Sequence, residues 1–556
     1  MANQATNDAD RQEELEKKLH EIELKQESRK YEDKAKKAGL PFSDFKSLPI
    51  NNDALSVIEE SVARSSQLAP VHKSGKRLTV ALTDPQNKAT QDLISELKGR
   101  GFELNMILTS PAILESILKR YANIKRIELF EVGAIDINEE EMGQIQGEIK
   151  NISDLKDKVV QIPVTKILEV LIAGALQIGA SDVHFEPEQE RARLRYRIDG
   201  VLNDVTFIDK LSYKKIVNRL KILSKLKLNI TNAPQDGRFS IRQVDVTIEV
   251  RVSILPSEYG ETIVMRLLDP RTIKKDLKEL GIREDLLKLI MEQLARSTGA
   301  ILTTGPTGSG KTTSLYAFLN FLNSPGTKIV TIEDPIEYHI NGVSQTQVEP
   351  EKGYDFANGL RAIVRQDPDV ILVGEIRDAE TAGIALHAAL TGHLVFSTIH
   401  TNNAAGTIPR LIDLGIEPQI IAPAINMAMA QRLLRRLCPN CKKEEKVLSP
   451  NKFEKIKEAL LPIKDQFKLP EINDKIKIFS PGTCKECNET GYKGRIGVYE
   501  AFLIKEEMER LILTSPAISD IEALAVKNGM VTMLQDAYMK LLEGTTSLEE
   551  IERVLS

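Results

Sequence analysis

The sequence contains no tryptophan, and aromatic residues make up only 5% of its 556 positions. The formal net charge is −5, close to neutral for a chain of this length. Proteins that bind nucleic acid over a large area carry basic surfaces, often interleaved with aromatic side chains on which bases stack. The composition therefore argues against a dominant nucleic-acid-binding surface, although it leaves room for a local basic patch.

Long apolar runs are also missing. No stretch approaches the ~20 apolar residues that a membrane-spanning helix needs. Residues 1–10 are polar and lack the apolar core of a signal peptide. Hydrophobic residues account for 42% and charged residues for 28% of the chain, which is the balance of an ordinary globular protein. We therefore expect a cytoplasmic protein that reaches a membrane only through partners.

Cysteine is scarce, and its four occurrences form two CxxC pairs separated by 42 residues. In a reducing compartment this pairing favours a metal site over disulfides. Zinc is the first choice for four thiolates and iron is the alternative, while four buried or oxidised thiols are the competing interpretation. Four protein ligands leave no open position for a substrate, so the site is expected to be structural. The predicted ligands are Cys438, Cys441, Cys484 and Cys487.

The length predicts two to four domains. Changes in composition and in apolar periodicity place the boundaries, and the last domain alternates strands and helices as a parallel sheet with crossover helices requires. The predicted parts are a charged helical or disordered tail (1–45), a small α/β domain (46–125), a linker rich in Glu, Asp and Asn (126–158), a second α/β domain (159–270), and a third (274–556) with a cysteine-bearing insertion (436–490) and a helical C-terminus.

A phosphate-binding loop is the most specific motif. An apolar strand over 300–304 precedes it, and a helix is predicted from Thr313 to Leu322. In this context glycines let backbone N–H groups surround phosphates, and the helix N-terminus adds partial positive charge. The lysine is expected to reach the outer phosphates and the threonine after it to bind Mg²⁺. The loop, which predicts an ATPase that uses ATP and Mg²⁺, is Gly305-Pro306-Thr307-Gly308-Ser309-Gly310-Lys311-Thr312.

Three downstream segments each place polar residues at the end of an apolar strand. They are Thr331–Glu337 with its three carboxylates, Asp369–Glu375 ending in an acid, and Gly392–Thr401 ending in His400 and Thr401. Carboxyl ends of neighbouring parallel strands form the ligand-binding edge of an α/β sheet. An acid there can hold Mg²⁺ through water or take a proton from the attacking water, and a histidine can contact the γ-phosphate. The predicted catalytic residues are Glu333, Glu337, Glu375 and His400.

These motifs and their order resemble the secretion ATPases of type II secretion and type IV pilus assembly. That family carries a P-loop, an Asp box, a Walker B segment and a His box, which match the four segments above. The resemblance covers roughly residues 45–556, and further matching stretches are Arg365–Asp369, Gly374–Asp378, Ala180–His184 and Arg195–Gly200. It implies a RecA-like P-loop NTPase domain preceded by a PAS-like α/β domain and a small N-terminal docking domain.

The resemblance also implies roles for single residues. In the family the nucleotide lies between the ATPase domain and the domain before it. Glu337 would be the base that activates water, and Glu375 would serve Mg²⁺ and its waters. Arginines of the preceding domain, chiefly Arg195, Arg197 and Arg238, would reach phosphate as arginine fingers, with exposed strand residues as an equal alternative. The segment at residues 269–275 is the expected hinge between the two domains.

The implied assembly is a homohexamer at the cytoplasmic face of the inner membrane. It would hydrolyse ATP to power type IV pilus assembly or type II protein secretion, with an inner-membrane platform protein and other components of the machine as partners. The four-cysteine element is typical of assembly-type members and is lacking in pilus-retraction members. Some relatives bind cyclic di-GMP through an Arg-Leu-Gly-type motif near the start, which residues 1–50 do not contain, so that ligand is not predicted.

Two other functions compete with the secretion motor. One is a DNA-uptake or conjugation-type motor, and the near-neutral charge and few aromatic residues count against it. The other is a regulatory nucleotide-binding module with little turnover, and the intact acids Glu333, Asp334, Glu337 and Glu375 count against that one.

Overall fold

The computed structural model describes residues 26–45, 50, 52–55, 57–121, 133–136, 149, 151–159, 164–243, 246–273, 275–445, 450–467, 469 and 476–555. The first 25 residues of the predicted tail lie outside this set. The chain divides into two compact units, residues 1–132 and 133–556. Within the described residues, no helix is both long and apolar enough to cross a membrane.

The first unit is a small α/β fold. Its three-stranded sheet has the order β1-β2-β3, with β1 antiparallel and β3 parallel to β2. A helix over residues 26–38 belongs to the charged segment, and Ala35 on it is buried in the core of this unit. The named elements are α2 (Asn52–Leu55), α3 (Glu60–Ser66), β1 (Leu68–Ser74), β2 (Arg77–Leu82), α4 (Lys88–Gly99), β3 (Glu103–Leu108) and α5 (Pro111–Leu118).

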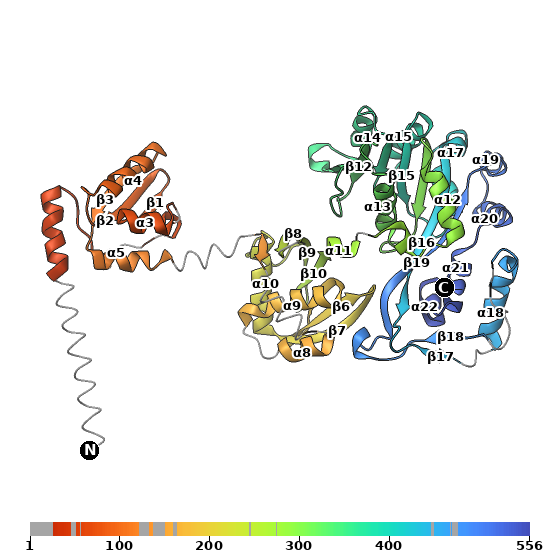
Figure 1. The fold of residues 1–556 in the computed structure, drawn as a ribbon, viewed down its shortest axis with the longest axis horizontal. Helices are drawn as coiled ribbons and strands as arrows, with labels where there is room; N and C mark the ends of the chain where they lie inside the picture. The colour runs from red at the N-terminus through yellow and green to blue at the C-terminus, as the bar shows by residue number, and fades with distance from the viewer. Residues whose placement is uncertain are drawn as a thin grey trace, which may run out of the picture. The chain divides into compact units, whose positions relative to one another are not determined.

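The second unit begins with a seven-stranded mixed sheet of order β4-β8-β9-β10-β5-β6-β7. Figure 1 labels β6 to β10 of this sheet together with the helices α9 and α10. Apolar side chains alternate along its strands and pack on one face against α9 and α10, which leaves polar and arginine side chains on the other face. The elements are α9 (Val164–Ile178), β5 (Ala180–Pro187), β6 (Arg191–Ile198), β7 (Val201–Asp209), α10 (Lys210–Leu223), β8 (Gln235–Arg242), β9 (Thr247–Ser257) and β10 (Gly260–Leu268).

The stretch predicted as a linker is partly folded. Strand β4 (Ala134–Asp136) pairs with β8 at the edge of this sheet, and α8 (Ile152–Val159) packs against α9. Ile135, Ile149 and Leu155 join the buried core. The high content of acidic residues and asparagine hid these isolated apolar anchors, and the linker prediction therefore differs from the structure here.

The ATPase module is built on a second seven-stranded sheet, of order β13-β12-β14-β15-β11-β16-β19. All pairs are parallel except β16 with β19. Its elements up to the last parallel strand are α11 (Pro270–Ile273), η1 (Leu277–Leu280), α12 (Glu284–Leu294), β11 (Gly299–Thr304), α13 (Lys311–Leu322), β12 (Ile329–Glu333), β13 (Ser344–Gln347), η2 (Pro350–Lys352), α14 (Phe356–Val364), β14 (Val370–Val373), α15 (Ala379–Leu390), β15 (Leu394–Ile399), α16 (Thr407–Asp413), α17 (Pro418–Ala424) and β16 (Ile425–Leu437).

Both faces of this sheet are covered by helices. In β11, Ala300 and Leu302 face the core that α14, α15 and α17 close, whereas Ile301 faces the core under α12 and α13. Strands buried on both faces are near-continuous apolar runs, which explains why every residue of β11, β12, β14 and β15 is buried. The sequence shows these strands plainly for the same reason.

The C-terminal part completes the module. Strands β16 and β19 (Tyr492–Leu503) pair over most of their length and lead to the cysteine element. That element holds β17 (Lys443–Glu445), α18 (Pro450–Leu460), η3 (Leu461–Ile463), β18 (Ile478–Ser480) and η4 (Lys485–Cys487), and the chain ends with α19 (Glu506–Ile512), α20 (Ile518–Lys527), α21 (Met533–Leu542) and α22 (Leu548–Leu555).

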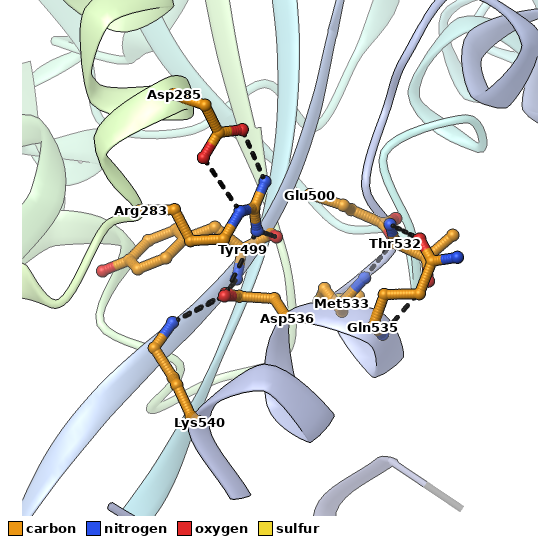
Figure 2. A network of polar contacts seen from close by, with 9 residues as sticks. All are labelled: Arg283, Asp285, Tyr499, Glu500, Thr532, Met533, Gln535, Asp536 and Lys540. Carbon is orange, nitrogen blue, oxygen red and sulfur yellow. Dashed lines mark hydrogen bonds and ion pairs between the residues drawn. The ribbon is translucent and has the colours of Figure 1, made fainter. Parts of the chain in front are cut away.

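A buried polar network ties α21 to β19 and to the start of α12 (Figure 2). Asp536 of α21 accepts a hydrogen bond from the Tyr499 backbone N–H at 2.7 Å and pairs with Arg283 and Lys540. Glu500, the residue after Tyr499 on β19, accepts hydrogen bonds from the backbone N–H groups of Ala404 and of Met533, the first residue of α21. These two carboxylates fix the C-terminal helices to the sheet.

Candidate active site

The phosphate-binding loop follows β11 and ends where α13 begins, as the motif predicts. Gly305 has φ = 142°, and a Cβ atom there would lie 2.5 Å from the Gln431 carbonyl oxygen, so only glycine fits. The buried Gln431 side chain donates a hydrogen bond to the Ser309 carbonyl at 2.8 Å. Strand β16, which carries Gln431, therefore packs against the phosphate-binding loop and holds it in place.

Lys311 is the first residue of α13. Its ammonium group donates hydrogen bonds to the carbonyls of Gly305 at 2.7 Å and Pro306 at 3.1 Å. Burial lowers the pKa of Lys311 below its ordinary value, and the neighbouring Glu375 carboxylate partly opposes that shift. The lysine thus lies at the centre of the loop, close to an acid from another strand.

The polar ends of the parallel strands meet around one cavity of about 470 Å³. Its lining combines residues of the phosphate-binding loop and the start of α13 with the acids and the histidine of the strand ends. The predicted residues in the lining are Thr307, Gly308, Gly310, Lys311, Thr312, Thr313, Glu333, Glu337, Glu375 and His400. The structure therefore brings together the four predicted catalytic residues and most of the loop.

Glu333 ends β12 and is 3% exposed. Tyr316 donates a short hydrogen bond to one carboxylate oxygen, while Thr331 and Gln345 donate to the other at 2.6 and 3.2 Å. Burial raises the pKa of Glu333, although these hydrogen bonds work in the opposite direction. Both oxygens already have donors, which suits a carboxylate that organises the site rather than one that exchanges protons.

Glu375, after β14, is held by the side chains of Arg377 and His400. Arg377 forms a short ion pair with it, and His400 Nε2 lies 3.2 Å from its other oxygen. Burial raises the pKa of Glu375, but the hydrogen bonds from Arg377 and His400 outweigh burial and hold the pKa below its ordinary value. Glu375 is therefore a stable anion close to Lys311, the property that a partner of a hydrated cation needs.

Glu337 is more accessible than the other two acids. Its side chain is 30% exposed and lies 3.3 Å from Arg251, whose guanidinium also donates to the Ile336 carbonyl at 2.9 Å. Arg251 lies on β9 of the preceding sheet, so the loop that carries Glu337 is tied to that module. A carboxylate that lines the cavity and keeps access to solvent has the placement expected of a base that acts on water.

The loop after β15 is tied to the strand that leads into the phosphate site. The Thr304 hydroxyl lies 2.7 Å from the Thr401 hydroxyl and accepts the Thr401 backbone N–H at 2.8 Å. Thr304 directly precedes Gly305, and Thr401 directly follows His400. This pairing fixes the histidine-bearing loop relative to the phosphate-binding loop.

The three arginines that were expected to reach phosphate differ from one another in their surroundings. Arg195 pairs with Glu186, and Arg197 lies 3.3 Å from Asp182. Arg238 lines a neighbouring cavity of about 650 Å³, which also borders Glu337. In the described residues the arginines that line the nucleotide cavity are Arg266, Arg377 and Arg495.

No role was predicted for Arg266 from the sequence. The missing information was strand pairing: Arg266 lies directly opposite Arg251 on β9, and Arg251 contacts Glu337. Arg495 lies on β19, beyond the motifs that define the site, and no local pattern connects it to phosphate.

The four cysteines converge as predicted. All four sulfur atoms lie within 4.8 Å of one another, with 3.8 Å between Cys438 and Cys484 and 3.8 Å between Cys441 and Cys487. A disulfide needs about 2.05 Å, whereas tetrahedral thiolates at about 2.3 Å from zinc are spaced about 3.8 Å apart. Gly491 N–H donates to Cys487 Sγ at 3.2 Å, a bond that stabilises a thiolate. The cluster fits a four-thiolate metal site.

Comparison with known proteins agrees with this geometry. A family model described as type II/IV secretion system protein matches residues 157–553, and the MshEN domain model matches residues 38–126. The first match spans more than half of the chain. The chain therefore belongs to the type II/IV secretion system protein family.

Two named relatives align with most of this chain and with most of their own length. The type IV pilus assembly ATPase PilB of Myxococcus xanthus is 35% identical over 518 residues, 93% of this chain and 89% of that protein. The type II secretion system protein E of Aeromonas hydrophila is 41% identical over 420 residues, 75% and 80% of the two chains. The X-ray structure of the Legionella pneumophila ATPase DotB has a TM-score of 0.51 at 21% identity and covers 69% of this chain and 94% of that one.

These findings confirm the family, the α/β fold class and the ATPase activity expected from the sequence. The chain is a secretion ATPase of the group formed by type IV pilus assembly and type II secretion ATPases. The DotB structure supports the fold alone. The roles of individual residues, the domain boundaries and the identity of the metal stay predictions.

Proposed function

We propose that this chain is an ATP-driven motor that powers either type IV pilus assembly or type II protein secretion. The observation that carries the proposal is the single cavity in which Lys311, Glu337, Glu375 and His400 meet. The loop supplies backbone N–H groups and a lysine for the phosphates, and the strand ends supply acids.

The proposed division of roles follows the surroundings of each acid. Glu337, accessible and at the cavity edge, takes the proton from the attacking water. Glu375 and the Thr312 hydroxyl are placed to serve Mg²⁺, which in such sites neutralises charge on the phosphate oxygens. His400 orients Glu375, and Glu333 keeps the loop of Glu337 in place through its buried hydrogen bonds.

Arg266 is the proposed arginine contact from the preceding module, with Arg238 as a second cation in the adjoining cavity. Arg195 and Arg197 remain predicted contacts for a different relative position of the two modules. The hinge is proposed at residues 269–275, where α11 and a short connection join the two sheets.

Zinc is the proposed metal of the four-cysteine cluster. The residues that would hold it are Cys438, Cys441, Cys484 and Cys487, and the ion would join β16 and the start of β19 without taking part in hydrolysis. The proposed assembly is a homohexamer that meets an inner-membrane platform protein at the cytoplasmic face of the membrane. The predicted domain boundaries belong to the same proposal, with residues 46–125 as the docking domain.

Phosphate release from size-fractionated protein tests the proposal. We expect turnover in a ring-sized fraction of the wild type, and its loss in Lys311→Ala, Glu337→Gln and Glu375→Gln. Glu337→Gln should lower kcat by about 10²- to 10⁴-fold while ATP still binds, because a general base contributes in that range. Glu351→Gln, an exposed acid outside the cavity, is the control. Wild-type activity in Glu337→Gln would show that Glu337 is not the base.

A further inference from the structure

Five charged side chains lie directly opposite one another on five neighbouring strands of the sheet before the ATPase module. In antiparallel strands, directly opposite residues point to the same face. The paired positions run from β8 through β9, β10 and β5 to β6. In that order they are Arg238, Arg251, Arg266, Asp182 and Arg197.

Four of these five residues are cations, which makes the row electrostatically unfavourable by itself. Like charges directly opposite one another destabilise a sheet. The first two arginines of the row have partners outside it, because Arg251 lies 3.3 Å from Glu337 and Arg238 lies 3.7 Å from Glu249. The only acid within the row is Asp182.

Asp182 is shared by the arginines on its two sides. Arg266 Nε donates to one carboxylate oxygen at 2.9 Å, and Arg197 Nε lies 3.3 Å from the other. The Ser181 hydroxyl donates to that second oxygen at 2.9 Å. The Asp182 side chain is 5% exposed, whereas Arg266 is 55% exposed and lines the nucleotide cavity. The buried Asp182 carboxylate thus binds the Nε–H of the accessible Arg266 guanidinium.

We infer that Asp182 is a positioning residue of the ATPase site, and that it aims Arg266 at the phosphates of the nucleotide. The inference rests on the proposed function. A long arginine side chain that is half exposed has many rotamers, and ordering it during each turnover would cost conformational entropy. The bond to Nε–H removes that freedom in advance and leaves the terminal amino groups of Arg266 as donors for an anion. Asp182 itself does not contact the nucleotide.

The test compares ATP binding and turnover in the full-length protein carrying Asp182→Asn. Asparagine keeps the shape but loses the charge that holds both arginines. We expect kcat to fall about ten- to a hundredfold, because small misplacements of catalytic groups have effects of that size. The dissociation constant of a fluorescent ATP analogue should stay within about twofold, because Lys311 and the phosphate-binding loop are unchanged.

The matched control is Asp204→Asn on β7. Asp204 accepts two hydrogen bonds from Arg193, at 2.6 and 2.8 Å, and so repeats the same chemistry in the same sheet. Within the described residues neither Asp204 nor Arg193 lines a cavity of the site. This variant should retain the wild-type kcat.

A double-mutant cycle separates positioning from general stability. If Asp182 acts through Arg266, Asp182→Asn should cause no further loss of kcat in an Arg266→Ala protein. Arg266→Lys keeps the positive charge, but lysine has no Nε–H to bind Asp182 while two further amino groups face the phosphates. This variant should therefore show the same loss of kcat as Asp182→Asn. It keeps the test valid even if Asp182→Asn folds poorly. Wild-type kcat in Asp182→Asn or in Arg266→Lys, or additive losses in the double variant, would overturn the inference. A wild-type protein without turnover would overturn the proposed function as well.

Discussion

The Asp536 carboxylate lies 3.2 Å from the guanidinium of Arg283, although the two residues are far apart in the sequence. Asp536 is fully buried, and Lys540 contacts the same carboxylate at 2.8 Å (Figure 2). Arg283 directly precedes α12, so this pair connects an early helix of the ATPase module with one of its last. Its position shows that the C-terminal helices are part of the module's core.

Removal of this anion should therefore destabilise the ATPase module. Asp536→Asn removes the buried carboxylate that Arg283 and Lys540 share, and breaking a buried pair from one side costs about 3–5 kcal/mol. Urea unfolding should show the shift in midpoint. Glu506→Gln is the control, because the Glu506–Arg510 pair is exposed and contributes about 0.5 kcal/mol or less. Equal midpoints for Asp536→Asn and the wild type would contradict the role given to the network.

Glu550 gives the protein a stability that depends on pH. Burial raises the pKa of Glu550, but hydrogen bonds from Arg553 and Arg435 outweigh burial and hold the pKa below its ordinary value. A depressed pKa in the folded state means that the stabilisation is present above the unfolded pKa of about 4.3 and is lost as pH falls through the folded value.

The free energy of unfolding should consequently differ between the wild type and Glu550→Gln at pH 7, and the difference should shrink as the pH falls below about 4. Urea titrations at several pH values measure it. Glu549→Gln, an exposed neighbour on the same helix, should show neither the loss nor the trend. A difference that grows on acidification would mean that the pKa of Glu550 is raised instead.

Gly305 should not tolerate a side chain. In Gly305→Ala the added Cβ would lie 2.5 Å from the Gln431 carbonyl oxygen at a φ that favours glycine, so the phosphate-binding loop must shift. We expect ATP affinity to fall at least about tenfold, because the loop's N–H groups no longer surround the phosphates. Gly326→Ala, where a Cβ meets nothing within 4 Å, should bind ATP like the wild type.

Loss of a metal from the four-cysteine cluster should lower the stability of the protein more than its rate of ATP hydrolysis. If the four cysteines hold zinc, Cys484→Ser or a strong chelator should lower the melting temperature and release about one zinc per chain, measured by elemental analysis. Hydrolysis per folded molecule should change little, because the cluster lies outside the nucleotide cavity. Ser480→Ala, beside the cluster on β18, is the control. A structural metal site would be contradicted if the purified wild-type protein contained no metal and its melting temperature did not change when zinc was added or removed.

The sequence by itself determined the elements whose chemistry is local. The phosphate-binding loop, the acids at the ends of β12 and β14 and the histidine after β15 are recognisable in the sequence, because doubly covered strands are apolar runs and the polar residues that end them stand out. The CxxC pairs were equally clear, since two ligands close in sequence share one metal. The folded part of the predicted linker was missed because its few apolar anchors are scattered among acidic residues.

Only the tertiary structure decided which distant residues meet. Strand register brings Asp182 to Arg266, the docking of α21 brings Asp536 to Arg283, and the contact between the two sheets' modules brings Arg251 to Glu337. Register in turn follows from the burial of one face of a whole sheet, a property of many residues together. The amino-acid sequence indicates that an arginine lies on a strand, but the neighbouring strand determines which carboxylate that arginine contacts.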